Sequence, residues 1–144
     1  MNSARHELVI MVVEDHNFQR KALMHQIRGL GYGNLLEAQD GEEALTQCQH
    51  HQVDILFCDL RMPGMDGLTL QKKLLELGSD LPVVIMTGHG DVDSAREAFR
   101  ALAVDFLEKP LDEARLLGAI SEAFARQRKT ADAALNRDQI QRLL

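Results

Sequence analysis

The sequence lacks any apolar run long enough to cross a membrane. Its longest uninterrupted apolar run is residues 8–13, LVIMVV, whereas a membrane-spanning helix needs about 20 such residues. The first residues, MNSARHE, contain one arginine but not the apolar core that a secretory signal requires. The sequence therefore predicts neither a membrane protein nor an exported one.

Cysteine and positive charge are also scarce. Cys48 and Cys58 are the only cysteines, and they form no CxxC or Cys/His ligand pattern. This argues against a disulfide scaffold or a zinc site, and two free thiols suit a cytoplasmic protein. The net charge is −6, with 22 acidic and 16 basic residues, so the basic surplus typical of a nucleic-acid binder is missing. We therefore expect no direct nucleic-acid binding by this chain.

Short apolar runs are what the sequence does contain. Five of them recur along the chain, at residues 8–13, 34–38, 54–58, 82–87 and 104–108. The first, third and fourth are rich in β-branched residues and barely alternate, which is typical of parallel strands covered on both faces. The second and fifth are shorter and more polar, as expected for the edges of the sheet.

Amphipathic segments follow each apolar run. Helical spacing predicts helices near residues 18–30, 40–48, 68–77, 91–102 and 112–124. Phe18 in the first helix, and Leu75 and Leu77 in the third, are among the apolar residues expected to face the core. Asp40 with Glu43 forms a capping-box pattern, and Asp91 and Asp112 are candidate caps for the last two helices. Five successive strand–helix units predict an α/β fold, a doubly wound five-stranded parallel sheet flanked by five helices.

Functional groups in such a sheet gather beyond the carboxyl ends of the strands, where the strand order reverses. The residues found there are Glu14 and Asp15 after the first strand, Asp59 after the third, Thr87 at the end of the fourth, and Lys109 after the fifth. We therefore expect three carboxylates, a hydroxyl and an ammonium group to converge.

The charges of this group are unbalanced. Two carboxylates 4 Å apart repel by roughly 4 kcal/mol at an effective dielectric of about 20, and Lys109 alone cannot neutralise three of them. A divalent cation would complete the balance, and oxygen ligands select Mg²⁺ or Mn²⁺. Mg²⁺, a lysine and a hydroxyl typically stabilise a transferring phosphoryl group. No GxxxxGK[ST] nucleotide-binding loop is present, which leaves a carboxylate that itself accepts the phosphoryl group.

Four motifs carry a family resemblance. VVED (12–15), DLRMPGMDG (59–67), MTGHG (86–90) and FLEKP (106–110) resemble the receiver domain of bacterial two-component response regulators. The resemblance implies a flavodoxin-like sheet with strand order 2-1-3-4-5 and a receiver domain over residues 1–128. Residues 129–144 are expected to form a helical linker that leads to an output domain outside this sequence.

The resemblance also implies a role for each site residue. Asp59 would be the phosphoacceptor; Asp15, Asp59 and the Arg61 carbonyl would bind Mg²⁺ directly; Glu14 would help through a water; Thr87 and Lys109 would contact the phosphoryl oxygens. The Lys109–Pro110 peptide bond would be cis. The phosphoryl donor would be a sensor histidine kinase or a phosphotransfer protein.

Phe106 lies where the family carries a switch aromatic. When Thr87 moves to meet the phosphoryl group, Phe106 would turn inward and change the surface of helix 91–102, strand 104–108 and helix 112–124. A homodimer through this surface is a further expectation. The C-terminal NRDQIQRLL resembles the linker before a LuxR-type helix-turn-helix, which favours transcriptional output; a single-domain regulator is the alternative.

Other interpretations remain open at this point. Asp59 alone could cap a helix or turn, and Glu14 and Asp15 could cap the first helix, although a cap needs one acid. Thr87, Lys109 and Phe106 could be an ordinary strand residue, a solvated lysine and a core residue. For the whole chain, the alternative to a phosphorylated switch is a phosphorylation-independent interaction module. A free-standing phosphatase of the haloacid dehalogenase type lacks its DxD pattern here.

Overall fold

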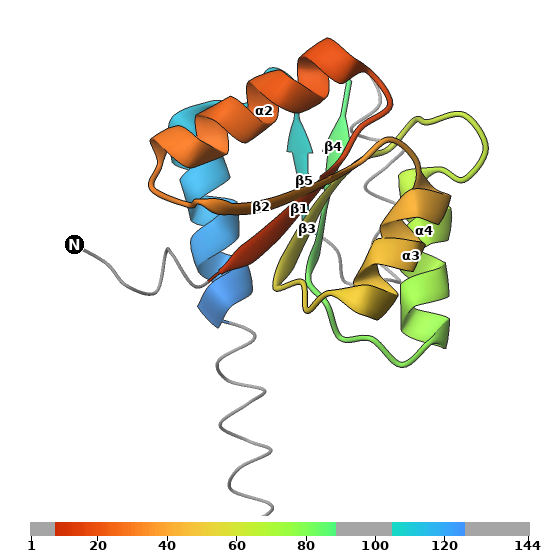
Figure 1. The fold of residues 1–144 in the computed structure, drawn as a ribbon. Helices are drawn as coiled ribbons and strands as arrows, with labels where there is room; N and C mark the ends of the chain where they lie inside the picture. The colour runs from red at the N-terminus through yellow and green to blue at the C-terminus, as the bar shows by residue number, and fades with distance from the viewer. Residues whose placement is uncertain (1–7, 89–104, 126–144) are drawn as a thin grey trace, which may run out of the picture.

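Five parallel strands form one sheet at the centre of the protein (Figure 1). This computed structural model describes residues 8–88 and 105–125. The strands are β1 (Val9–Val13), β2 (Asn34–Ala38), β3 (Ile55–Asp59), β4 (Val83–Thr87) and β5 (Asp105–Glu108). Their order is β2-β1-β3-β4-β5, so the predicted order and both predicted edge strands are confirmed.

Four helices lie within the described ranges. They are α2 (Asn17–Gly29), α3 (Gly41–His50), α4 (Gly67–Glu76) and a helix over residues 113–125. The helix predicted over 91–102 and the linker predicted over 129–144 lie outside the described residues. In the part of the chain that is described, no helix is long and apolar enough to span a membrane.

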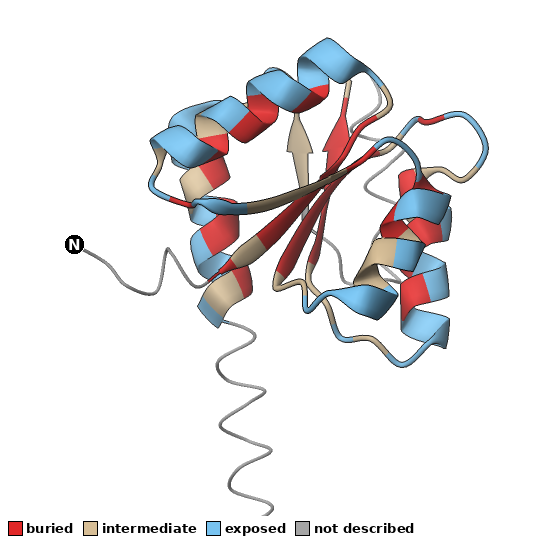
Figure 2. Cartoon of the chain, viewed as in Figure 1, coloured by how far each residue is buried: buried red, intermediate tan, exposed pale blue. Residues whose placement is uncertain are grey.

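The helices form two layers, one on each face of the sheet. Helix α2 and the helix over 113–125 cover one face, and α3 and α4 cover the other (Figure 1). The central strands β3 and β4 are buried along their whole length (Figure 2). Each fully buried aliphatic side chain, such as Ile10 or Leu56, contributes about 1.5–3 kcal/mol through removal from water. This core holds the carboxyl ends of the strands in a fixed arrangement.

Two of the expected helix caps are present. The Asp40 carboxylate accepts the Glu43 N–H at 2.8 Å, and Asp112 accepts an N–H in the first turn of the helix over 113–125 at 2.7 Å. The Glu43 carboxylate accepts a hydrogen bond from the N–H of Gln39 at 3.2 Å, whereas a capping box would use the N–H of Asp40. Both caps satisfy donors that helix starts otherwise leave open.

The predicted apolar faces of two helices are partly wrong. Phe18 is 84% exposed, and Leu75 and Leu77 are 47% and 64% exposed. On α2 the buried stripe is Arg20, Leu23, Met24 and Ile27. Phe18 lies outside this stripe because it precedes Leu23 by five residues, about 140° around the helix. On α4 the buried stripe likewise runs through Leu70 and Leu74 and leaves its last leucines outside.

Candidate functional site

Backbone hydrogen bonds extend the sheet beyond the ends of its strands. The Leu60 N–H donates to the Met86 carbonyl at 2.8 Å, and the Lys109 N–H donates to the Thr87 carbonyl at 2.8 Å. The Glu14 N–H donates to the carbonyl of Ala38, the last residue of β2, at 3.1 Å. Backbone hydrogen bonds therefore tie the segments that carry these predicted site residues to the sheet.

The ammonium group of Lys109 joins three elements of the fold. Its Nζ lies 3.1 Å from Glu14 Oε2 and 3.3 Å from Asp59 Oδ2. A third contact, to Gln19 Oε1 at 3.1 Å, comes from α2. Glu14 and Asp59 are only 1% and 7% exposed. The structure thus brings together three of the predicted residues, while Gln19 was not predicted.

The Glu14 carboxyl shows the effect of this crowding. Burial raises the pKa of Glu14 above its usual value, and repulsion from Asp59 adds to the rise. The His16 N–H, which donates to Glu14 Oε1 at 3.1 Å, and the ammonium of Lys109 act against it and favour the ionised form. The one ammonium group beside Glu14 therefore does not offset its burial and the repulsion from Asp59.

Two predicted residues carry buried oxygens that are left unsatisfied. Within the described residues, Asp15 Oδ1 and Thr87 Oγ1 have no hydrogen-bond partner. A buried polar atom without a partner costs about 1–3 kcal/mol, and native proteins keep few of them. Ligand atoms of Glu14, Asp15 and His16 lie within 4.8 Å of one another. The carboxylate oxygens and the unsatisfied Asp15 oxygen fit a divalent cation.

Helix capping does not account for these acids. His16 occupies the N-cap position of α2, and that helix has no side-chain cap bond. Asp59 is the last residue of β3 and pairs with Lys109. The Glu14 carboxylate does hold the backbone of the loop before α2, through His16. The capping alternative is thus wrong for Asp59 and Asp15 and holds only in part for Glu14.

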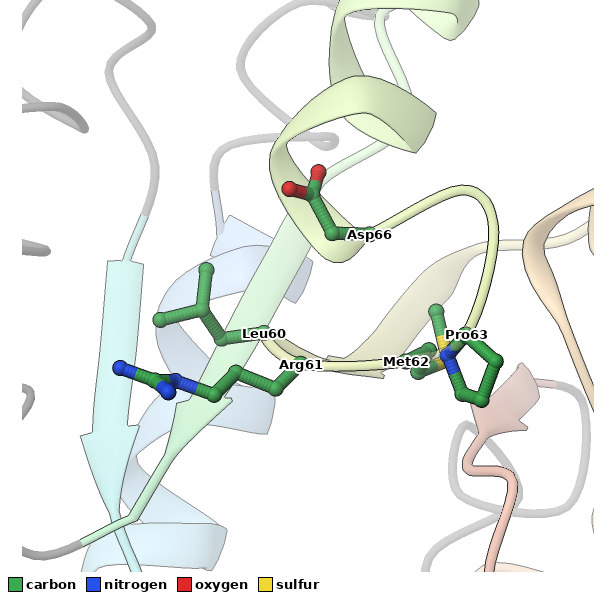
Figure 3. Close-up of a pocket in the computed structure, with 5 residues that line it drawn as sticks. All are labelled: Leu60, Arg61, Met62, Pro63 and Asp66. Carbon is green, nitrogen blue, oxygen red and sulfur yellow. The ribbon is translucent and has the colours of Figure 1, made fainter.

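The loop after β3 borders a cavity of about 570 Å³. Leu60, Arg61, Met62, Pro63 and Asp66 line it (Figure 3). The side chains of Leu60 and Arg61 extend in one direction and those of Met62 and Pro63 in the other (Figure 3). The Arg61 side chain is exposed, and the binding of Mg²⁺ by the Arg61 carbonyl stays a prediction.

Glycine at the start of α4 permits a close approach to the site. A Cβ atom at Gly67 would lie 2.8 Å from the carbonyl oxygen of Asp59 and 3.0 Å from Ile85 Cδ1. The preceding residue, Asp66, caps α4 by accepting the Thr69 N–H at 2.8 Å. Helix α4 is therefore packed directly against the backbone of the predicted phosphoacceptor.

Strand β5 carries Phe106, the remaining predicted residue, and leads into the Lys109–Pro110 bond. Phe106 pairs in register with Ile85 of β4, is half-buried, and packs against the apolar cluster under α3 and α4. The Lys109–Pro110 peptide bond is cis, as predicted. A cavity of about 430 Å³, lined in part by Glu14, Phe18 and Lys109, opens beside the ammonium group.

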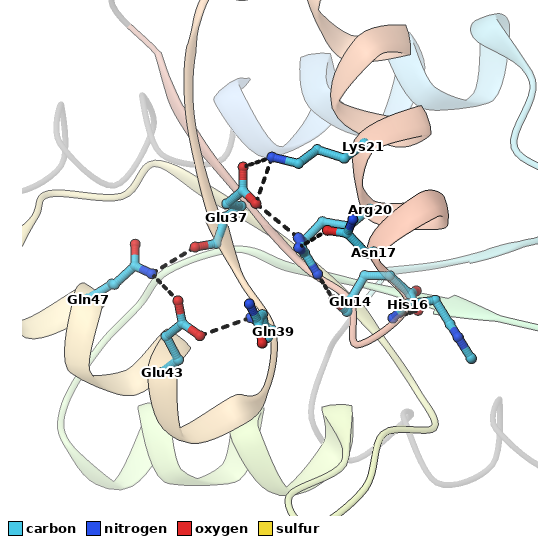
Figure 4. A network of polar contacts seen from close by, with 9 residues as sticks. All are labelled: Glu14, His16, Asn17, Arg20, Lys21, Glu37, Gln39, Glu43 and Gln47. Carbon is cyan, nitrogen blue, oxygen red and sulfur yellow. Dashed lines mark hydrogen bonds and ion pairs between the residues drawn. The ribbon is translucent and has the colours of Figure 1, made fainter.

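A second polar cluster lies behind the β1–α2 loop (Figure 4). The buried Arg20 bonds the Glu14 carbonyl at 2.9 Å and pairs with Glu37 Oε1 at 3.1 Å. Lys21 also pairs with Glu37, at 2.7 Å. None of these contacts was predicted. One signal was available, because Arg20 occupies the same helical face as Met24 and Ile27, where a charge is unusual unless paired.

The fold and the site together define a class of protein. The open parallel sheet has two buried acids and a lysine at its carboxyl edge, which is where α/β proteins of this architecture bind their ligands. Residues 10–121 match the response regulator receiver domain. The chain belongs to this family.

Individual relatives agree with the family. The transcriptional regulatory protein ZraR of Salmonella typhimurium is 38% identical over 126 residues, which are 88% of this chain and 28% of that protein. The response regulator protein TmoT of Ectopseudomonas mendocina is 38% identical over 117 residues, 81% of this chain and 53% of that protein. The chain therefore spans about a quarter to a half of the length of these relatives.

Solved structures show the same fold. FixJ-N superposes with a TM-score of 0.74 at 35% identity, covering 82% of this chain and 94% of that one. A response regulator receiver domain protein from Clostridium thermocellum superposes with a TM-score of 0.78 at 26% identity, covering 85% and 98%. The flavodoxin-like fold implied by the sequence resemblance is confirmed.

Proposed function

We propose that this chain is a signalling switch that accepts a phosphoryl group on Asp59 from a phosphohistidine of a partner kinase or phosphotransfer protein. The observation that carries the proposal is the contact of Lys109 with both Asp59 and Glu14, at 3.3 and 3.1 Å. Three different strand ends supply a buried carboxylate, a second acid and an ammonium group. This combination suits phosphoryl transfer better than it stabilises the fold.

The residues present fit a divalent cation. Asp15, Asp59 and the Arg61 carbonyl would hold Mg²⁺ or Mn²⁺, with Glu14 assisting through a water. The unsatisfied Asp15 oxygen supports this assignment. The bound cation would supply positive charge to the oxygens of the transferring phosphoryl group.

The remaining chemistry belongs to the side chains. A carboxylate oxygen of Asp59 forms a bond to phosphorus while the bond from phosphorus to the donor nitrogen breaks, and the donor histidine keeps that electron pair and takes up a proton. Lys109 and Thr87 donate hydrogen bonds to the phosphoryl oxygens. Thr87 Oγ1 has no partner within the described residues, so its hydroxyl is available. Attack of water on phosphorus later releases phosphate and restores Asp59.

Phosphorylation would be transmitted through Thr87 and Phe106. Movement of Thr87 toward the phosphoryl group opens space into which Phe106 turns, and the packing around β5 and the helix over 113–125 changes. The half-buried state of Phe106 supports this role. The first part of the surface, residues 91–102, lies outside the described residues.

The proposed output of the switch is supported by the names of the relatives. We infer a receiver domain over residues 1–128 and a linker over 129–144 that leads to an output domain, with transcription as the controlled process, as the names of ZraR and TmoT suggest. Dimerisation through the changed surface and a cytoplasmic location belong to the same proposal.

Labelling by acetyl phosphate tests the phosphoacceptor. Intact-mass measurement should show one added phosphoryl group on the wild type with Mg²⁺, none after chelation with EDTA, and none for Asp59→Asn. Equal labelling of Asp59→Asn would disprove the assignment.

A second measurement separates the switch from a phosphorylation-independent interaction module. Beryllofluoride, which mimics the phosphoryl group on an aspartate, should shift the amide resonances of β5 and the helix over 113–125. If these resonances stay in place although the adduct forms, the interaction module is the better interpretation.

A further inference from the structure

Arg20 is a buried arginine that contacts the backbone of Glu14 (Figure 4). It is 3% exposed, and each of its three guanidinium nitrogens makes one contact. Nη1 donates to the Glu14 carbonyl at 2.9 Å, Nε donates to Glu37 Oε1 at 3.1 Å, and Nη2 donates to the Asn17 side chain. These partners lie on the β1–α2 loop, on β2 and on α2.

We propose that Arg20 is a positioning residue for the cation site, because it fixes the backbone from which Glu14 and Asp15 project. This inference rests on the proposed function and names a residue that acts on its metal site. Glu14 has its N–H bound to β2 and its carbonyl bound to Arg20. Its peptide groups are therefore held on both sides, and Asp15 follows at the next position.

The charge of Arg20 is largely offset, so its contribution is geometric. A lone positive charge near Glu14 would oppose cation binding. Glu37 lies 3.1 Å from Arg20 and supplies a compensating negative charge. Hydrogen bonds from Lys21 and Arg20 hold the pKa of Glu37 below its usual value, so Glu37 stays ionised at neutral pH. The guanidinium group can therefore anchor the loop without repelling a cation strongly.

The three contacts require the shape of arginine. A guanidinium group presents donors in a fixed planar fork, whereas the ammonium group of lysine is a compact charge on a flexible stem. Arg20→Lys keeps the charge but loses the simultaneous bonds to the Glu14 carbonyl, Glu37 and Asn17. Arg20→Met removes both the charge and the bonds. The two variants together separate geometry from electrostatics.

The test measures the affinity of the folded chain for Mn²⁺, by the spectrum of free Mn²⁺ in electron paramagnetic resonance, and for Mg²⁺ by competition. Both Arg20→Lys and Arg20→Met should bind the cations about tenfold more weakly, the lower end of the range for residues that support metal ligands. Lys21→Met is the matched control, because Lys21 contacts the same Glu37 but not the loop. The affinity of this variant for Mn²⁺ and Mg²⁺ should equal that of the wild type.

Two results would overturn the proposal. If Arg20 acts only through its charge, Arg20→Met binds the cation more tightly and Arg20→Lys matches the wild type. If Arg20 only supports the fold, both variants melt at lower temperature but bind with wild-type affinity. Circular dichroism melts establish that each variant is folded at the temperature of titration.

The remaining outcomes distinguish this inference from the proposed function. If the wild type binds no Mn²⁺, the cation site is rejected, and the basis of the proposed function is rejected with it. If the wild type binds Mn²⁺ and Arg20→Lys binds it with the same affinity, only the role of Arg20 is rejected. Should Arg20→Met not fold, Arg20→Lys and Asn17→Ala decide the question, since Asn17→Ala removes one of the three anchors and should give a smaller loss of affinity.

Discussion

Two polar clusters share Glu14 and differ in how well they are satisfied. In the Arg20 cluster, formed by Arg20, Lys21, Glu37 and Asn17, the guanidinium group uses all its nitrogens and opposite charges are paired. In the acidic site, the Lys109 ammonium group pairs with two carboxylates, those of Glu14 and Asp59, and Asp15 and Thr87 have unsatisfied oxygens within the described residues. The first cluster is complete without a ligand, whereas the second is not.

The difference separates structure from function at a single strand end. The backbone of Glu14 belongs to the satisfied cluster, and its carboxylate belongs to the unsatisfied one. Proteins rarely leave buried polar atoms without partners unless a ligand or a reaction uses them. Changes on the acidic side should therefore alter chemistry more than stability, and changes in the Arg20 cluster should alter stability and geometry.

The largest expected effect is on the chemistry. Lys109→Ala should slow labelling by acetyl phosphate by about 100-fold or more, because it removes a charged donor to the transferring group. Lys21→Ala removes a lysine of the same type from the Arg20 cluster and should label at the wild-type rate. Time courses of intact mass measure both, and equal slowing of the two variants would erase the distinction between the clusters.

The next effect in size is on stability. Arg20→Met should lower the free energy of unfolding by about 2 kcal/mol, since it removes buried hydrogen bonds to charged and backbone acceptors. Urea denaturation in metal-free buffer measures this loss. A change within the error of the measurement would show that the Arg20 cluster adds nothing to stability.

Asp59→Asn should have the opposite effect on the free energy of unfolding in the same buffer. Removing one of several crowded acids should leave the metal-free fold as stable as the wild type or more stable by about 1 kcal/mol. Added Mg²⁺ should then stabilise the wild type more than the variant, since binding to the native state raises stability. A clear loss of stability without metal would show that Asp59 is a structural residue.

Ionisation of Glu14 should make the stability of the fold depend on pH, with an effect similar to or smaller than that of Asp59→Asn. The pKa of Glu14 is raised in the fold above the ordinary value of 4.5, so the folded state favours the neutral carboxyl. The free-energy cost of ionising Glu14 in the folded state is absent below about pH 4.5. It grows as the pH rises from there to the raised pKa. Without metal, Glu14→Gln should match the wild type near pH 4 and exceed it in stability near pH 7. Equal stabilities at both pH values would contradict the cause assigned to the shift.

The smallest effect is expected at Lys21. Its side chain is 56% exposed, and exposed ion pairs contribute about 0–1 kcal/mol. Lys21→Met should therefore lower stability by about 0.5 kcal/mol or less, and added salt should reduce even this difference. A loss as large as that of Arg20→Met would mean that the Arg20 cluster depends on its surface ion pair.

The fold was accessible from sequence because its signals are local and repeated. Unalternating apolar runs give buried parallel strands, and Asp40 and Asp112 mark helix starts that the structure confirms. Phe18 was misplaced because its five-residue distance from Leu23 puts it outside the buried stripe of α2. The spacing of Leu77 is helical, but Leu77 follows the last residue of α4, and burial at a helix end also depends on the rotation of the helix against the sheet. That rotation is set by packing between distant segments and not by local sequence.

The acidic site was also accessible, and the Arg20 cluster was not. Residues that follow parallel strands must meet at one edge, so the contacts of Lys109 with Glu14 and Asp59 follow from topology. The contact of Gln19 with Lys109 depends on side-chain conformations across a helix–sheet interface. The pairing of Arg20 with Glu37 depends on the register of β2 beside β1, which no sequence motif encodes.

Gly67 limits how this site can be altered. Any side chain at this position would meet the carbonyl of Asp59, which belongs to the backbone and cannot turn aside. A saturation library at position 67 should therefore return glycine almost alone, even when it is screened only for expression and not for signalling. The helix would have to move away for any other residue to fit, so the tolerance of this one position to substitution reports how closely α4 is packed against Asp59, the proposed phosphoacceptor.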